Sequence, residues 1–235
     1  MDEKKLPYDI TRRLEIRQEA ESDPAYGKPP DKRSIEELLE YGVVNLDKPS
    51  GPTSHEVTSW VKKILDAKKA GHGGTLDPKV TGILPVAINS ATKVVQALLP
   101  AGKEYVALMH LHGDVDFYRL VDVMNRFVGV IDQRVPQRAA VKRRVRKRRI
   151  YYIHLLEVEG RDVLFRVGCQ AGTYIRVLCH DFGKELGVGA HMAELRRTRT
   201  GPFREDHTLV TLHDLLDAYI FWRENGDESY IRRCV

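Results

Sequence analysis

The residues best placed to do chemistry lie in one segment, residues 70–85, where a single carboxylate, Asp77, stands among four glycines and two prolines. Glycine permits positive φ and close approach of the backbone, and Pro78 pushes Asp77 toward an extended conformation. This density of breakers predicts a stiff, irregular loop without a regular helix or strand. A carboxylate on such a loop suits catalysis, because functional residues concentrate on loops held by a scaffold. A turn in which Asp77 caps its own backbone fits the spacing equally well.

The composition of the whole chain favours a polyanionic partner. The 235 residues are 42% hydrophobic and 30% charged, which suits one domain with a core beneath a charged surface. The net charge of +5 is concentrated in a basic run at 142–149 and in a second cluster at 196–199. Such runs predict contacts to nucleic-acid phosphates. The basic residues of the first run are Lys142, Arg143, Arg144, Arg146, Lys147, Arg148 and Arg149.

Several classes of protein are disfavoured. Cys169, Cys179 and Cys234 are far apart and form no CxxC pair, which argues against a disulfide framework or a zinc site and predicts buried thiols for the inner two. No apolar run is long enough to span a membrane, and the N-terminus lacks a secretory apolar region. We therefore expect no metal, no membrane partner and an intracellular, cytoplasmic location.

Periodicity predicts an α+β fold with a mixed, largely antiparallel central sheet and flanking helices. We expect an N-terminal extension (1–40), a catalytic domain (41–222) and a charged C-terminal tail (223–235). The predicted helices span 34–41, 54–67, 91–99, 116–128, 173–186 and 211–222, and the predicted strands span 42–46, 104–111, 150–158 and 163–169. Residues 129–138 look irregular, and Trp60 belongs to an apolar stripe expected to be core.

Six short segments, in order along residues 33–222, carry a resemblance to a known family. They are 45–49 (NLDKP), 51–54 (GPTS), 71–78 (GHGGTLDP), 103–105 (KEY), 172–176 (GTYIR) and 190–199 (AHMAELRRTR). Together they resemble the TruB family of pseudouridine synthases, and within it the dyskerin-like branch of archaeal H/ACA RNA-guided ribonucleoproteins. Gly74 fits this branch, because the bacterial tRNA-modifying branch usually has serine there.

The resemblance implies isomerisation of uridine to pseudouridine in RNA, without a metal or an organic cofactor. The bond from C1′ to N1 breaks, the base turns, and C5 joins C1′. In the RNA-guided branch the target is ribosomal RNA, chosen by an H/ACA guide RNA that assembles with small core proteins. The uridine must leave its stack, which costs a few kcal/mol.

The resemblance also implies roles for individual residues. Asp77 corresponds to the catalytic aspartate, either as a nucleophile at C1′ or as a base toward the sugar. An ionised carboxylate in a pocket that excludes water needs a cation beside it, and Arg176 corresponds to the arginine that pairs with it. Tyr105 corresponds to the tyrosine that packs on the flipped base, where stacking contributes roughly 1–3 kcal/mol.

Five further positions follow from the same resemblance. Tyr174 and Leu195 correspond to pocket-lining residues, although both are equally compatible with ordinary core. His72 corresponds to a histidine that faces the RNA near the flipped nucleotide. Lys48 and Pro49 belong to a motif that supports the active-site loop, so their expected part is structural.

Two features depart from the family pattern. The RNA-guided branch normally carries a C-terminal PUA domain that grips the guide RNA, and residues 223–235 leave no room for one. Either the sequence is truncated or the domain is absent or separate, so the resemblance does not carry over the anchoring of guide RNA. Residues 134–140 (RVPQRAA) stand where relatives typically have a Pro-Pro pair, which predicts altered handling of the target.

Alternative functions remain open from the sequence. A stand-alone synthase for the T-arm of tRNA would need the same pocket, and a scaffold that holds guide RNA without turnover would need only the basic surface. A glycosidase that excises bases is disfavoured, because sugar hydrolysis usually takes two paired carboxylates and only Asp77 is a credible candidate.

Overall fold

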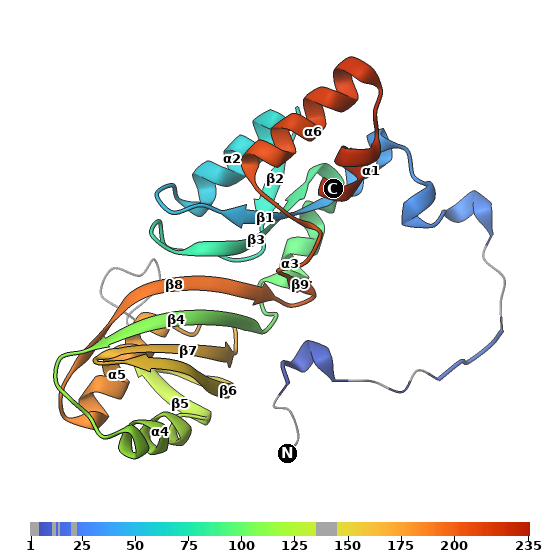
Figure 1. Cartoon of the computed structure of the whole chain (residues 1–235). Helices are drawn as coiled ribbons and strands as arrows, with labels where there is room; N and C mark the ends of the chain where they lie inside the picture. The colour runs from blue at the N-terminus through green and yellow to red at the C-terminus, as the bar shows by residue number, and fades with distance from the viewer. Residues whose placement is uncertain (1–4, 11–12, 14, 20–22, 135–144) are drawn as a thin grey trace.

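One mixed sheet organises the part of the chain that the computed structural model describes, residues 5–10, 13, 15–19, 23–134 and 145–235. The strand order is β10-β1-β3-β8-β4-β7-β6-β5, with β2 paired to β3 and β9 paired to β8 (Figure 1). Neighbouring strands are antiparallel except β1 with β10 and β3 with β8, so the predicted mixed, largely antiparallel sheet is confirmed. The strands are β1 (Val43–Lys48), β2 (Ala70–His72), β3 (Thr81–Ile88), β4 (Lys103–Leu111), β5 (Gly129–Arg134), β6 (Val145–Glu159), β7 (Asp162–Cys169), β8 (Ala190–Thr200), β9 (Phe203–Arg204) and β10 (Leu209–Val210).

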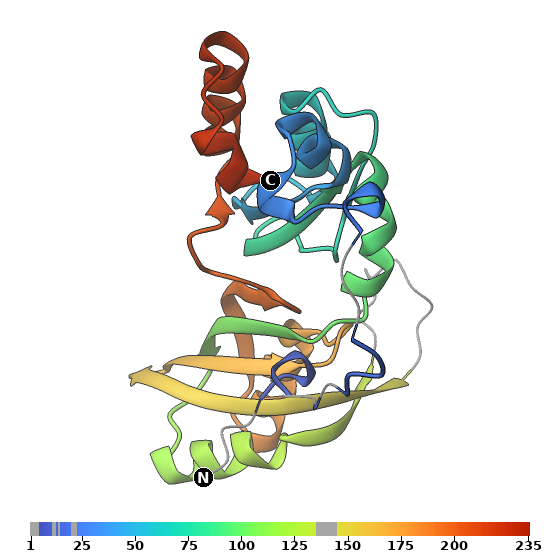
Figure 2. The ribbon, with the colours of Figure 1, turned by 90° about the vertical axis from the view of Figure 1, so that its right-hand side faces the viewer.

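Helices cover the two halves of the sheet separately (Figures 1 and 2). α2 and α6 pack on the half that contains β1 and β3, and α4 and α5 pack on the half that contains β4 and β7. The halves meet where β3 pairs with β8 over two residues, directly after the loop that carries Asp77. The helices are α1 (Ile35–Tyr41), α2 (Ser54–Ile64), α3 (Val95–Leu98), α4 (Phe117–Arg126), α5 (Ile175–Leu186), α6 (Leu212–Asn225) and α7 (Ser229–Cys234), with 3₁₀ turns at Pro7–Asp9, Pro24–Tyr26, Pro30–Lys32 and Asn89–Val94.

Local sequence patterns predict the positions of most helices and strands correctly. The Thr53 hydroxyl accepts from the Glu56 amide at 3.2 Å, and the Glu56 carboxylate accepts from the Thr53 amide at 2.7 Å, which starts α2 as predicted. Burial alternates along β4, as the spacing of Tyr105 and its neighbours predicts. The predicted helix over 91–99 is instead a 3₁₀ turn followed by the four residues of α3.

The prediction that residues 70–85 hold no regular strand is wrong, because β2 and β3 occupy the two ends of that segment. Pro85 lies in β3 opposite Asn45 of β1. Its backbone faces Gly73 and not β1, so the pairing with β1 does not use the Pro85 nitrogen. Its carbonyl accepts from the Gly73 amide at 2.8 Å. Gly82 has φ +100, and a Cβ at this position would lie 2.2 Å from the Arg197 carbonyl oxygen.

The strands β5 and β8 were also not predicted from the sequence. Residues 129–134 form β5 rather than an irregular segment, because they pair in register with β6 across the hairpin. The remainder of the segment predicted to be irregular, including the departure from the family at 135–140, lies outside the described residues. β8 was not predicted as a strand, since its charged residues do not alternate with apolar ones as a half-buried strand requires.

Trp60 is not a core residue, contrary to the prediction. The buried stripe of α2 is centred on Val57 and Val61, both fully buried. At 3.6 residues per turn Trp60 lies roughly 80° from the centre of this stripe, and its side chain is 41% exposed.

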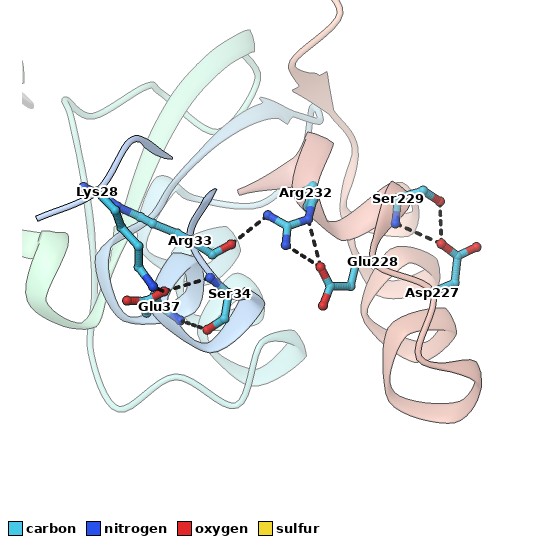
Figure 3. Close-up of polar contacts among 8 residues, drawn as sticks. All are labelled: Lys28, Arg33, Ser34, Glu37, Asp227, Glu228, Ser229 and Arg232. Carbon is cyan, nitrogen blue, oxygen red and sulfur yellow. Dashed lines mark hydrogen bonds and ion pairs between the residues drawn. The ribbon is translucent and has the colours of Figure 1, made fainter. Parts of the chain in front are cut away.

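Both terminal segments are anchored to the domain. Leu6 is fully buried beside Gly102, and the Asp9 carboxylate forms an ion pair with Arg199 at 2.5 Å, so the extension finds the surface that it needs for order (Figure 2). At the other end, α7 buries Ile231, and the Arg232 guanidinium donates to the Arg33 carbonyl at 2.8 Å (Figure 3). The segment after residue 222 is therefore folded, contrary to the predicted charged tail.

Figure 3 shows how α1 is capped next to this contact. The Ser34 hydroxyl accepts from the Glu37 amide at 3.3 Å, and the Glu37 carboxylate accepts from the Ser34 amide at 2.8 Å and pairs with Lys28 at 2.7 Å. This is the capping box that the sequence predicts at Ser34. Arg232 also binds Glu228 one turn earlier in the chain, which fixes its guanidinium toward α1.

Candidate active site

A cleft of about 540 Å³ opens where the two halves of the sheet meet. Its walls come from the loop after β2, from β4, from β8 and from the start of α5. Five predicted site residues line it: Asp77, Tyr105, Tyr174, Arg176 and Leu195. The tertiary structure thus brings together side chains that are up to 118 residues apart in sequence (77 to 195).

Asp77 and Arg176 face each other in this cleft. The Oδ2 atom of Asp77 lies 3.4 Å from Nη1 of Arg176, and the two side chains are 58% and 53% exposed. The predicted exclusion of water is therefore not a property of the protein by itself. An ion pair this exposed contributes at most about 1 kcal/mol to folding, so the contact is better suited to function than to stability.

Buried polar groups hold the loop that presents Asp77. The Lys48 ammonium is fully buried and donates to the carbonyls of Pro49, Pro78 and Val80, each at 2.9 Å. Burial, followed by the charge of Arg197, lowers the pKa of Lys48. These contacts have the geometry that loop support by Lys48 and Pro49 requires.

Ser54, at the start of α2, fixes the residue before Asp77. Its hydroxyl accepts from the Leu76 amide at 2.8 Å and donates to the Leu76 carbonyl at 3.1 Å. Both residues are buried. Ser54, the residue after the Thr53 N-cap of α2, therefore also fixes the loop that carries Asp77.

Arg197 is a component of the site that the sequence did not reveal. It pairs in register with Tyr105, is 1% exposed, and donates to the carbonyls of Ile83 at 2.7 Å and Gly74 at 3.0 Å. The guanidinium thereby links β3, the loop that carries Asp77 and β8 beneath the cleft. Tyr105 itself is 8% exposed, and burial raises the pKa of its hydroxyl.

The cluster at 196–199 does not form a basic surface, so that prediction is wrong. Arg196 binds the Asp47 carboxylate through two nitrogens at 3.0 and 2.8 Å, and Arg199 binds Asp9 in the same two-pronged manner. With Arg197 buried, all three charges have partners within the protein. A run of arginines signals charge, but neighbouring segments decide whether that charge reaches solvent.

Lys103 is a second buried cation of the cleft. It is 5% exposed and donates to three carbonyls at the end of α3, those of Leu98, Leu99 and Ala101, at 2.9–3.1 Å. Burial, with the charge of Arg197, lowers its pKa to about 8. Its place in the 103–105 segment was the only sequence signal for it.

His72 does not line the cleft that contains Asp77. It borders a second cleft of about 340 Å³ beside α2, where its ring meets that of His55 edge-on at 5.1 Å. Its Nδ1 accepts from the Gly74 amide at 3.4 Å. Burial, then the charges of His55 and Arg197, lowers the pKa of His72, so the ring is neutral near pH 7.

The basic run is only partly described, because residues 142–144 lie outside the described residues. Arg146, Lys147, Arg148 and Arg149 lie on β6. Lys147 and Arg149 are exposed, and Arg148 donates to the Gly172 carbonyl at 3.0 Å beside the cleft. The described part of the run thus extends from an exposed strand to the edge of the cleft.

The described residues lack two features. They contain no group of three or more His, Cys, Asp and Glu side chains placed to share a metal ion. None of the described helices combines the length and the apolar character that a membrane crossing takes.

Comparison with known proteins identifies the family. The model for the TruB family pseudouridylate synthase N-terminal domain matches residues 62–175, that for the tRNA pseudouridylate synthase B C-terminal domain matches 176–235, and that for the DKCLD (NUC011) domain matches 3–58. "Probable tRNA pseudouridine synthase B" of Pyrococcus horikoshii is 66% identical over 98% of this chain and 69% of its own length. The chain belongs to the TruB family of pseudouridine synthases. It is an RNA isomerase of that family.

Relatives and solved structures extend this result. The protein of the same printed name from Methanopyrus kandleri is 64% identical over 99% of this chain and 69% of its own length. A "Cbf5-Nop10-Gar1 Complex" contains a chain that is 65% identical, with a TM-score of 0.95 over 98% of this TruB-family chain and 70% of the other. An "H/ACA RNP bound to a substrate RNA containing 2'-deoxyuridine" gives a TM-score of 0.91 at 63% identity over 97% and 69%. The predicted pseudouridine synthase fold is confirmed.

Proposed function

We propose that this pseudouridine synthase modifies uridines of ribosomal RNA that an H/ACA guide RNA selects. The main observation in support of this function is the Asp77–Arg176 ion pair, whose Oδ2 and Nη1 atoms lie 3.4 Å apart in a cleft that Tyr105 also lines. The volume of about 540 Å³ lies within the usual range for small-molecule sites and accommodates a flipped nucleotide. The likeness to H/ACA ribonucleoprotein structures supports the guided mode.

The proposed reaction needs one carboxylate and no cofactor. Asp77 attacks C1′ or removes a proton from the sugar, and either step requires its ionised form. Arg176 supplies the opposite charge, and Tyr105 offers its ring to the base once it has left the stack. When C5 has joined C1′, C5 loses its proton to solvent and N1 gains one, so that atoms and charge balance.

The remaining predicted residues surround this centre. Tyr174 and Leu195 form walls of the cleft, and Lys48 and Pro49 stabilise the loop of Asp77. His72, on the other side of the loop, offers a neutral ring to the RNA next to the flipped nucleotide.

The proposed assembly contains guide RNA, substrate RNA and small core proteins, as the names of the matched complexes suggest. The basic side chains of β6 would hold RNA phosphates, with a cost in affinity as salt rises. Such a particle would act in the cytoplasm. A stand-alone tRNA synthase is the second candidate, because the curated relatives carry that name.

The test measures tritium released from C5 of labelled uridine in RNA, with and without guide RNA, for wild type and Asp77→Asn. Guide-dependent release that disappears in the variant supports the proposal. Release from tRNA without a guide favours the stand-alone synthase. Tight RNA binding without tritium release under either condition would show that the protein is a scaffold that holds guide RNA, and it would overturn the catalytic role of Asp77.

A further inference from the structure

Gln133, near the end of β5, binds the backbone of Tyr174 through both ends of its side-chain amide. Its Nε2 donates to the Tyr174 carbonyl at 3.1 Å, and its Oε1 accepts from the Tyr174 amide at 3.0 Å. The side chain is almost completely buried, at 2% exposure. No feature of the sequence marked this residue, because the partners are 41 positions apart.

The chemistry of this clamp is specific to an amide. One side chain must donate to a carbonyl and accept from an N–H at the spacing of a backbone peptide. A carboxylate cannot donate, and an aliphatic chain of similar length can do neither. Burial makes the loss costly, since a backbone group left without a partner away from water keeps its full desolvation penalty.

The clamp acts at the start of α5. Tyr174 is the N-cap residue, and its side chain supplies no capping hydrogen bond. Its carbonyl also accepts from the amides of Val177 and Leu178 at 3.1 and 3.0 Å, which begins the helix. Gln133 therefore holds the backbone of the N-cap residue itself, at a helix start that lacks the side-chain cap a Ser, Thr, Asp or Asn would supply.

Arg176 follows in the first turn of α5 and depends on that start for its position. Among the described residues, its only ion-pair partner is Asp77, and both side chains are about half exposed. The backbone of α5 is thus the main constraint on the guanidinium. Displacing reacting groups by about 1 Å can cost roughly 100-fold in rate.

The same hairpin holds the residues just before Tyr174. The Gln170 side chain accepts from the Arg149 amide at 3.1 Å, and the Gln170 amide donates to the Arg149 carbonyl at 2.8 Å. Arg148 donates to the Gly172 carbonyl at 3.0 Å. Residues 170–174 are therefore joined to β6 by its basic residues and to β5 by Gln133.

We propose that Gln133 is a positioning residue that joins the basic β5–β6 hairpin to the catalytic pair. RNA phosphates bound on β6 are thereby held at a fixed distance from the Asp77–Arg176 contact. This inference rests on the proposed function of the cleft. It adds to it a mechanical link through a side chain that itself touches no substrate.

The kinetic test compares Gln133→Met and Gln133→Glu with wild type in the assembled particle. We expect kcat for tritium release to fall about 10- to 100-fold, with KM and RNA affinity within threefold of wild type. Asn89→Asp is the matched control. Asn89 also binds backbone in both directions, donating to Leu39 at 2.9 Å and accepting from Lys68 at 2.8 Å, outside the cleft. Its kcat should stay near that of wild type.

Rescue by pH separates positioning from a general structural role. The carboxyl introduced by Gln133→Glu regains a donor when protonated, and burial raises its pKa. The ratio of variant to wild-type kcat should therefore rise as pH falls from 8 to 5.5 for Gln133→Glu and stay flat for Gln133→Met. A flat ratio for both variants, or a kcat equal to wild type, overturns the proposal.

A readout without RNA keeps this test separate from that of the proposed function. Amide hydrogen exchange of residues 174–178 should be faster in Gln133→Met than in wild type, and unchanged in Asn89→Asp. Faster exchange with an inactive wild type supports the clamp and refutes the synthase reaction. Unchanged exchange refutes the clamp whatever the activity. Gln133→Asn, which keeps the amide on a shorter stem, serves both measurements if the methionine variant does not fold.

Discussion

Replacing Arg176 by alanine tests whether the exposed ion pair serves catalysis. The guanidinium lies 3.4 Å from Asp77, and each side chain is more than half exposed in the free protein. We expect the free energy of unfolding to change by less than about 1 kcal/mol, as for other exposed ion pairs. We expect RNA affinity to fall only modestly, because one positive charge among many is lost.

The expected effect on kcat follows from the distance. Two unit charges 3.4 Å apart attract by about 1 kcal/mol in bulk water and by about 5 kcal/mol at an effective dielectric constant of 20. Bound RNA replaces water over the cleft, so the effective dielectric constant around the ion pair falls from that of bulk water toward 20. The difference of about 4 kcal/mol is an upper limit and corresponds to roughly three powers of ten. We therefore expect kcat to fall about 100- to 1,000-fold.

Single-turnover tritium release and a filter-binding assay on the same RNA measure the two quantities. Arg119→Ala is the control, because Arg119 is an exposed arginine on α4 and does not line the cleft. It should leave kcat unchanged. Equal losses of kcat and RNA affinity in Arg176→Ala would show a simple RNA contact. A loss of several kcal/mol in unfolding free energy would show a structural residue.

Two predictions concern stability. Gly82→Ala should lower the free energy of unfolding by at least about 3 kcal/mol in urea titrations, since strain at φ +100 adds to a clash 2.2 Å from the Arg197 carbonyl. Gly129→Ala, at φ +127 with open space, should cost clearly less, and equal losses would disprove the clash. Lys103, with a pKa lowered to about 8 by burial, binds its proton more weakly folded than unfolded. Stability relative to Lys103→Met should therefore rise by about 1–3 kcal/mol between pH 8 and 10.5, and a difference independent of pH would contradict the shift.

Local elements were predictable because their causes are local. The Ser34 and Thr53 capping boxes, and the alternation of β4 around Tyr105, depend on residues within a few positions of one another. The strand β3 was missed because Gly82 and Pro85 disfavour strands in isolation. Gly82 is tolerated because the backbone of Arg197 lies too close for a Cβ, and Pro85 is tolerated because its backbone faces Gly73 and not its partner Asn45 on β1.

In the candidate site, too, some residues could be predicted from the sequence and others could not. The motifs identified Asp77, Arg176 and Tyr105, and the resemblance assigned their roles, which stay predictions. They did not show that Arg197 is buried or that Gln133 holds the start of α5, because the partners of both come from remote segments.

By itself, the sequence determined the family and the starts of α1 and α2, and it singled out the loop of Asp77, since short-range patterns and motif order encode them. Only the tertiary structure decided which charges are buried or paired and which face the cleft. Burial depends on what the rest of the chain places around a residue, and no spacing along the sequence records it.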